Sequence, residues 1–299
     1  MKKRTLLFRG TGTALVTPFK KDGSVDEVVL RELVDRQIRA KVDALVPVGS
    51  TGEAATLSDA EQAHVIEVVV EQVRGRIPVI AGASSNSTSK AIALAKEAKR
   101  RGADAILTVA PFYNKPTQEG LYQHFGAIAE AVEIPVVIYN VPGRTASNIE
   151  ARTALRLADE SPFIAGVKEA SANIGQIMEI LHHRPRGFGL WSGDDNLTLP
   201  LVALGADGII SVVSNEIPAE FAMMVRHALR GNYEKARDLH YRLLGLMNLN
   251  FIESNPIPVK AAMAMMELMG ETTRLPLTSL SDAARPKLEQ ALRELKLIR

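Results

Sequence analysis

The sequence predicts a (β/α)8 barrel with a C-terminal helical extension, an architecture of the α/β class. Short, β-rich apolar runs recur eight times, and each is followed by a polar loop and a segment of helical periodicity. This alternation is typical of βα units around a parallel sheet. Internal repetition supports the same fold, because residues 101–109 resemble residues 204–212: in both, a glycine ends a helix and a buried strand follows.

The apolar runs give the expected strands, which are residues 13–19, 44–49, 78–83, 105–110, 135–140, 164–168, 189–193 and 208–213. After about residue 230 the strand signals stop, and helices are predicted over residues 233–248, 256–269 and 282–295. We therefore expect a barrel over residues 1–230 and a three-helix extension over residues 231–299. Pro256 is the expected first residue of the middle helix, behind an Asn255 cap.

A doubly wound open sheet is the alternative fold. It is disfavoured because no Gly-x-Gly-x-x-Gly motif follows the first strand and because the units number eight.

The amino-acid composition is typical of a globular protein and argues against nucleic-acid-binding and membrane proteins. The 299 residues are 46% apolar and 23% charged, which is enough for a sizeable core, and the 36 basic and 34 acidic residues are scattered rather than clustered. No run approaches the roughly 18 apolar residues of a membrane span, and the basic N-terminal stretch is too short in apolar residues for a secretory signal. The absence of cysteine fits a reducing compartment. We expect a cytoplasmic protein without nucleic-acid or membrane partners.

Catalytic side chains of barrel enzymes lie where the strands end, and Lys168 is the most informative residue found there. It ends an apolar strand, and burial in such a place lowers the pKa of a lysine. A neutral amine can attack a ketone to form a Schiff base. The alternative is a structural salt bridge from Lys168 to Glu169 or Glu53.

Hydroxyl groups and one guanidinium follow other strands. Tyr139, Tyr113, Ser50 and Thr51 could form a proton relay for imine formation, although a tyrosine at a strand end can equally be packing. The glycine-flanked loop that holds Ser50 and Thr51 offers N–H groups to a carboxylate, or is an ordinary βα turn. Arg144, after the fifth strand, could grip a second carboxylate or be solvated. Thr17, Asp194 and Asp195 also lie at strand ends, without an evident role.

Metal chemistry is disfavoured by the positions of the histidines. A zinc-dependent aldolase needs several histidines facing the site. All six histidines instead fall in segments predicted to be helical, namely His64, His124, His182, His183, His227 and His240. We expect no metal and no other cofactor.

Three motifs, at residues 49–53, 139–145 and 166–171, together resemble the dihydrodipicolinate synthase / N-acetylneuraminate lyase family over essentially the whole chain. Residues 111–116 and 255–260 are similar to the synthase branch. The resemblance implies a (β/α)8 barrel with three C-terminal helices, usually assembled as a tetramer. It also implies a lyase that condenses pyruvate with L-aspartate 4-semialdehyde in the diaminopimelate route of lysine biosynthesis.

The resemblance gives each catalytic candidate a role. Lys168 is implied to form the imine and Tyr139 to donate and accept protons. Ser50 and Tyr113 would complete the relay, with Tyr113 reaching into the site of a neighbouring subunit. Most synthases have threonine at the position of Ser50, but serine still supplies a hydroxyl.

The resemblance also implies the substrate contacts. Thr51 and its loop would hold the pyruvate carboxylate, beside the backbone of Ile210, and Arg144 would bind the carboxylate of the semialdehyde. Two other functions stay open at this point. One is a Schiff-base aldolase or lyase for another 2-keto acid, such as a keto-deoxy sugar acid or 4-hydroxy-2-oxoglutarate. The other is a barrel that binds keto acids without catalysis.

The regulatory pocket of the family is altered. Lysine-inhibited bacterial members generally carry histidines, a glutamate and a tyrosine at positions that match Asp59, Gln62, Lys90 and Phe112, and only Asn86 is retained. Lys90 would repel the ammonium group of L-lysine. The sequence therefore predicts weak or absent feedback inhibition by L-lysine.

Overall fold

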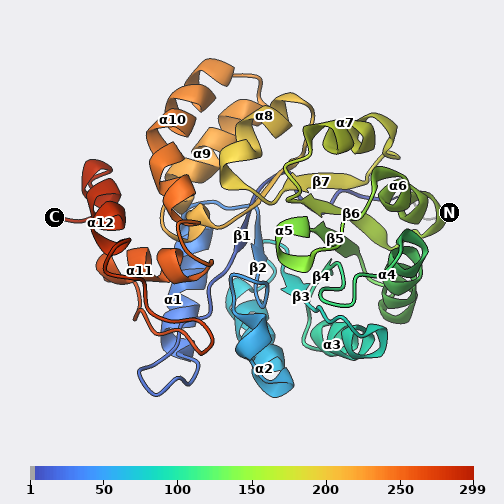
Figure 1. Cartoon of the computed structure of the whole chain (residues 1–299), viewed down its shortest axis with the longest axis horizontal. Coiled ribbons are helices and arrows are strands. Elements are labelled where there is room, and N and C mark those ends of the chain that lie inside the picture. The colour runs from blue at the N-terminus through green and yellow to red at the C-terminus, as the bar shows by residue number, and fades with distance from the viewer. Residues whose placement is uncertain (1–3) are drawn as a thin grey trace.

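The structure, a computed structural model, describes residues 4–299, so the first three residues of the basic N-terminal stretch lie outside it. Eight parallel strands form one sheet in the order β2-β1-β8-β7-β6-β5-β4-β3. A bridge between Leu45 of β2 and Val79, next to β3, joins the two edges into a barrel. Helices surround the strands (Figure 1). The predicted fold class is confirmed.

The strands are β1 (Gly10–Ala14), β2 (Ala44–Val46), β3 (Ile80–Gly82), β4 (Ala105–Val109), β5 (Val136–Asn140), β6 (Ile164–Glu169), β7 (Gly189–Ser192) and β8 (Gly208–Ser211). The helices of the barrel are α1 (Glu27–Arg39), α2 (Asp59–Val73), α3 (Thr88–Arg100), α4 (Gln118–Val132), α5 (Pro142–Thr145), α6 (Ala151–Glu160), α7 (Ile174–His183), α8 (Thr198–Ala203) and α9 (Pro218–Leu229). The C-terminal helices are α10 (Tyr233–Leu249), α11 (Ile257–Met265) and α12 (Arg285–Glu294).

The first strand was predicted too late in the chain. It was expected at residues 13–19, but β1 begins at Gly10, which has a φ of +137° and pairs with Gly208 of β8. A glycine-rich strand carries little apolar signal. Leu15 and Val16 are buried like strand residues but lie beyond β1, because burial against the core does not require regular pairing.

The start of the middle C-terminal helix was also predicted incorrectly. Pro256 is the cap of α11 rather than its first residue, and no side chain caps the helix. The side chain of Asn255 instead donates a hydrogen bond to Thr51 Oγ1 over 2.9 Å. A tertiary contact thus replaces the expected local cap.

The end of the barrel at the strand N-termini is filled by two aromatic rings. Phe8 stacks on Trp191 with ring centroids 4.8 Å apart and an interplanar angle of 13°. Two glycines make room for the indole: a Cβ at Gly166 would lie 2.6 Å from Trp191 Cζ3, and one at Gly189 would lie 2.1 Å from Trp191 Cη2. The barrel interior is therefore packed at this end, and a site inside the barrel can open only toward the strand C-termini.

The C-terminal helices, orange to red in Figure 1, lie along one side of the barrel. They share an apolar cluster with α9 that includes Phe221, Val225, Leu243, Leu246, Ala261 and Leu288. The division between residues 230 and 231 stays a prediction. Within residues 4–299, no helix is both long enough and apolar enough to cross a membrane.

Gly189→Ala is expected to lower the free energy of unfolding by about 2–3 kcal/mol, because the new methyl group overlaps the indole of Trp191. Urea denaturation measures the change. Gly126→Ala is the matched control, since Gly126 lies in α4 and a methyl group added there would meet open space. It should leave stability unchanged or raise it by up to about 1 kcal/mol. Equal effects of the two substitutions would contradict the packing argument.

Candidate active site

Register places Lys168 and Tyr139 side by side inside the barrel. Tyr139 of β5 pairs with Lys168 of β6, which in turn pairs with Trp191 of β7. Because side chains alternate along a strand, Lys168 faces inward while its neighbour Val167 packs in the outer core. Lys168 is 5% exposed and Tyr139 8% exposed. The Lys168 Nζ lies 4.3 Å from the centroid of the Tyr139 ring.

Burial lowers the pKa of Lys168 to about 8. The carboxylates of Asp194 and Asp195 oppose this shift, and Arg144 adds to it. Space for the lysine side chain comes from Gly193, where a Cβ would lie 3.1 Å from Lys168 Cε. The amine can therefore lose its proton near neutral pH, as a nucleophile must.

The structural salt bridge considered for Lys168 is not formed. Within residues 4–299, no hydrogen bond or ion pair holds Lys168 Nζ. Glu53 pairs with Lys260 over 2.5 Å. Glu169 accepts hydrogen bonds from Asn140 and from the backbone N–H of Ser171. Both proposed partners are thus engaged elsewhere.

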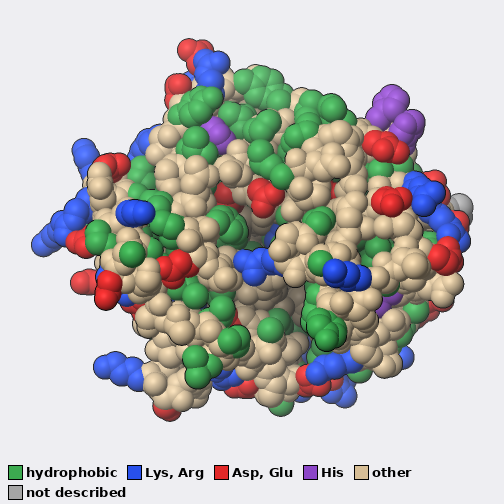
Figure 2. All heavy atoms as spheres, viewed as in Figure 1, with side chains coloured by type: hydrophobic (Ala, Val, Ile, Leu, Met, Phe, Trp, Pro, Cys, Tyr) green, Lys and Arg blue, Asp and Glu red, His purple; other side chains and the backbone are tan. Residues whose placement is uncertain are grey.

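A cleft with a cavity volume of about 50 Å³ opens at the C-terminal ends of the strands. Of the predicted site residues, five line it: Lys168, Tyr139, Ser50, Thr51 and Arg144. In Figure 1, α5, which carries Arg144, lies near the centre of the barrel, and Figure 2 shows this face hollowed near its centre. The cleft thus lies at the end of the barrel where active sites of this fold are found.

Asn255 joins the C-terminal extension to this cleft. Its side chain binds Thr51 Oγ1, and its carbonyl oxygen accepts a hydrogen bond of 3.4 Å from Arg144. Arg144 itself lies in the short helix α5 rather than in an open loop. Sequence reasoning treated Asn255 only as a helix cap, and Phe251, which also lines the cleft, was not considered.

Two predicted site residues do not line the cleft. Tyr113 is 90% exposed, in the loop after β4, and has a φ of +73°. Ile210 is fully buried in the interior cluster that contains Tyr139 and Trp191, while Val212 lines the cleft two residues further on. Ser50 lines the cleft, but within the described chain no hydrogen bond joins it to the Tyr139 hydroxyl.

Asp194 and Asp195, which follow β7, have different surroundings in the structure. Asp194 lines the cleft, and burial raises its pKa. Asp195 is buried and accepts hydrogen bonds from the backbone N–H groups of Val212 and Val213, over 3.2 Å and 2.9 Å, which fixes the chain after β8. Burial raises the pKa of Asp195 to about 6. Their positions at the end of a predicted strand identified both residues as candidates, but the sequence did not predict a role for either.

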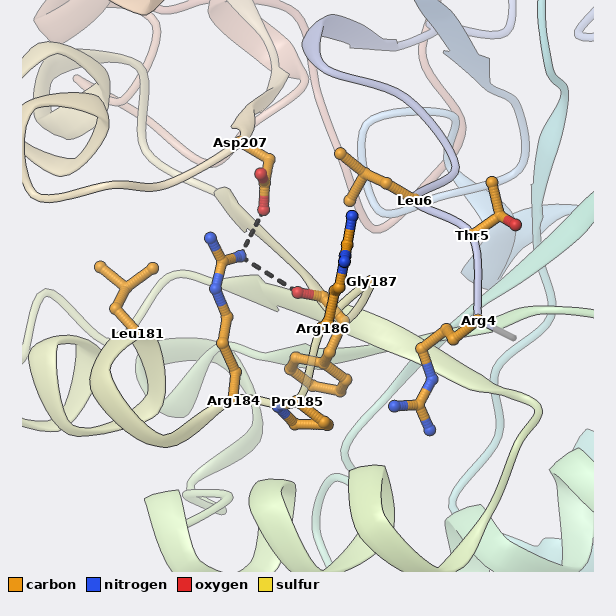
Figure 3. A pocket seen from close by; sticks show the side chains of 10 residues that line it. Arg4, Thr5, Leu6, Leu181, Arg184, Pro185, Arg186, Gly187 and Asp207 are labelled. Atoms are coloured by element: carbon orange, nitrogen blue, oxygen red, sulfur yellow. Dashed lines mark hydrogen bonds and ion pairs between the residues drawn. The ribbon is translucent and has the colours of Figure 1, made fainter. Parts of the chain in front are cut away.

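A larger cleft, with a volume of about 660 Å³, lies away from this chemistry (Figure 3). Its lining comes from the segment before β1 and the segment before β7, so it is at the N-terminal ends of the strands. There Arg184 pairs with Asp207 and donates a hydrogen bond to the carbonyl of Phe188. Active sites of barrel enzymes lie at the opposite end, so this cleft is not the catalytic one.

All six histidines lie in helices, as predicted. Over the described range, residues 4–299, no group of three or more side chains of the types that bind metals is brought together.

The Dihydrodipicolinate synthetase family is matched over residues 7–295. The chain belongs to this family. A 4-hydroxy-tetrahydrodipicolinate synthase of Koribacter versatilis is 55% identical over 96% of this chain and 95% of its own. One of Chlorobium phaeobacteroides is 51% identical over the whole of both chains. The dihydrodipicolinate synthase of Acinetobacter baumannii, solved as a chloride-inhibited enzyme with pyruvate, is 45% identical with a TM-score of 0.95, over 97% of this chain and 99% of its own.

The pKa of Lys168 predicts how imine formation depends on pH. An amine attacks a ketone only in its neutral form, so if Lys168 is the nucleophile, kcat/KM for pyruvate should rise about tenfold per pH unit below pH 8 and level off above it. Steady-state kinetics from pH 6 to about pH 10 measure this limb. A limb near the ordinary lysine value of about 10.4 would contradict the desolvation of Lys168.

Proposed function

We propose that Lys168 forms the Schiff base through which this enzyme joins pyruvate to L-aspartate 4-semialdehyde. The enzyme is a lyase, a 4-hydroxy-tetrahydrodipicolinate synthase, as are relatives of about half-identical sequence over the full chain. The observation that carries the proposal is a buried lysine without an ion-pair partner, in the cleft at the strand C-termini and beside a tyrosine. A sensor of keto acids would not need such an amine.

The chemistry follows from the two side chains. The neutral amine of Lys168 attacks the keto carbon of pyruvate, and water must then leave. Burial raises the pKa of Tyr139, so its hydroxyl stays protonated and can supply a proton to the departing oxygen. Loss of a methyl proton gives an enamine, whose carbon attacks the aldehyde. Attack of the substrate amine on the imine carbon closes the ring and releases Lys168.

Each substrate carboxylate is assigned to a residue according to where that residue lies in the cleft. Thr51 and the N–H groups of its loop hold the pyruvate carboxylate near Lys168, with the backbone of Ile210 nearby. Arg144, which is exposed at the mouth of the cleft, binds the carboxylate of the semialdehyde. Ser50 contributes a hydroxyl to the proton relay from the wall of the cleft.

Tyr113 completes the relay from a neighbouring subunit of a homotetramer. Its exposure of 90% supports this, because the ring is free to contact a second chain and the neighbouring Phe112 is exposed as well. A positive φ holds the residue in a backbone conformation that an L side chain rarely adopts, which favours a functional reason for it. The cysteine-free composition supports a cytoplasmic location.

Borohydride reduction in the presence of pyruvate tests the proposal. The expected result is one reduced pyruvate adduct, on the peptide that contains Lys168, and none in Lys168→Ala. Lys260 is an internal control, since it is also fully buried but is paired with Glu53. Peptide mass mapping locates the adduct. Modification of Lys260, or of any lysine other than Lys168, would overturn the assignment.

Inhibition by L-lysine is expected to be weak or absent. Lys90 lies 3.5 Å from Asp59 on the surface, and the Gln62 amide donates to the carbonyl of Ala54. A lysine effector would bring its ammonium group toward the cation of Lys90. Activity at saturating substrate should therefore persist at millimolar L-lysine, and Lys90→Glu should increase the sensitivity. A sub-millimolar inhibition constant for the unmodified enzyme would contradict this prediction.

A further inference from the structure

We propose that Asp194 binds the α-ammonium group of L-aspartate 4-semialdehyde and accepts the proton that this nitrogen loses when the product ring closes. The inference rests on the function proposed above, because it concerns the second substrate of the same reaction. It adds a catalytic residue on the loop after β7 to those on β5 and β6.

The main chain of Asp194 is fixed, while its carboxylate is free. The backbone N–H donates to Ser192 Oγ over 3.1 Å, and the carbonyl oxygen accepts from the same hydroxyl over 2.8 Å. Thr198 Oγ1 donates to that carbonyl over 3.3 Å. Within residues 4–299, the carboxylate itself has no hydrogen bond or ion pair. A partly buried carboxylate without a partner is unfavourable for folding, which points to a ligand.

Charge complementarity identifies the group that this carboxylate binds. Three charged side chains line the cleft, namely Lys168, Arg144 and Asp194. In the proposed reaction, Lys168 is occupied by pyruvate and Arg144 by the carboxylate of the semialdehyde. The semialdehyde also carries an ammonium group, and Asp194 is the one carboxylate among the lining residues. Arg144 and Asp194 thus match the two charges of the semialdehyde.

Asp194 also stands near the reacting atoms. Its charge acts on both Lys168 and Tyr139, raising the pKa of each. The substrate nitrogen must reach the imine carbon held on Lys168 Nζ, so a carboxylate beside this amine is placed to bind that nitrogen. Burial raises the pKa of Asp194, which makes it a stronger base than an exposed aspartate.

The ring-closing step balances with water as the only other proton acceptor. The ammonium transfers one proton to the Asp194 carboxylate, and the neutral amine forms a bond to the protonated imine carbon, which then carries both nitrogens. Asp194 passes its proton to Lys168 Nζ, and the attacking nitrogen, now cationic, loses its second proton to water. The lone pair freed on this nitrogen forms the C=N bond of the ring while the bond to Nζ breaks with its electron pair passing to Nζ, so Asp194 and the neutral lysine are both restored.

A rival role is that Asp194 only stabilises the cationic imine on Lys168. The two roles predict that different substrates are affected when Asp194 is replaced. If Asp194 stabilises the imine, its loss should slow the reaction of the enzyme with pyruvate in the absence of any aldehyde. If Asp194 binds an ammonium group, its loss should weaken only an aldehyde that carries such a group. Succinate semialdehyde has the same aldehyde and carboxylate but no amino group, so it separates the two cases.

The experiment compares Asp194→Asn with the unmodified enzyme. Borohydride trapping of pyruvate and exchange of its methyl protons in D2O should persist, which also shows that the variant folds. The kcat/KM for L-aspartate 4-semialdehyde should fall about 10- to 150-fold, the range for loss of one charged hydrogen bond. The inhibition constant of succinate semialdehyde should not change. Asp194→Glu, which keeps the carboxylate, should recover part of the lost activity.

Arg144→Ala is the matched control, because it removes a contact that both aldehydes share and should weaken both. Loss of pyruvate trapping in Asp194→Asn, with the fold retained by circular dichroism, would overturn the proposal in favour of imine stabilisation. Equal weakening of both aldehydes, or of neither, would also overturn it. Failure to trap pyruvate on Lys168 in the unmodified enzyme is a different result, since it would refute the proposed function itself.

Discussion

Glu53 and Lys260 form an ion pair 2.5 Å long whose two side chains are wholly buried. Lys260 also donates to the carbonyl of Thr17, and Glu53 accepts from the backbone N–H of Arg274. Loss of one partner from such a pair leaves an uncompensated charge and destabilises a protein by about 3–5 kcal/mol. The pair joins the segment after β1, the loop after β2 and the C-terminal extension. The loop that holds Thr51 is therefore positioned by helices that follow the barrel in sequence.

Two buried lysines of this chain meet the same energetic problem in different ways. Lys260 has Glu53 beside it, and this carboxylate opposes the effect of burial on the pKa of the amine. Lys168 has no such partner, so desolvation lowers its pKa to about 8. The contrast explains why burial alone does not make a lysine reactive. At Lys168, Glu169 and Glu53 are both held by other groups, and Asp194 opposes the shift without forming an ion pair with the amine, so burial has the larger effect on the pKa.

Local sequence pattern predicted the barrel, the inward position of Lys168 and most of the cleft, because strand periodicity and strand ends are encoded by neighbouring residues. It failed where a position depends on distant contacts. Asn255 meets Thr51 across 204 positions of sequence, and no local signal distinguishes that contact from a helix cap. Gly10 starts β1 through pairing with β8, which apolarity cannot report. Tyr113 requires a second chain to acquire its predicted role.

The stacked rings of Phe8 and Trp191 close one end of the barrel interior. They fill the interior on the side of the strand N-termini, so the cleft at the other end is the one beside which Lys168 lies. In the proposed reaction, an aldehyde held by Arg144 nearer the mouth would obstruct a pyruvate that arrived later. The proposal therefore requires pyruvate to bind before the aldehyde. This binding order would follow from the aromatic pair, which closes the other end of the barrel without touching either substrate.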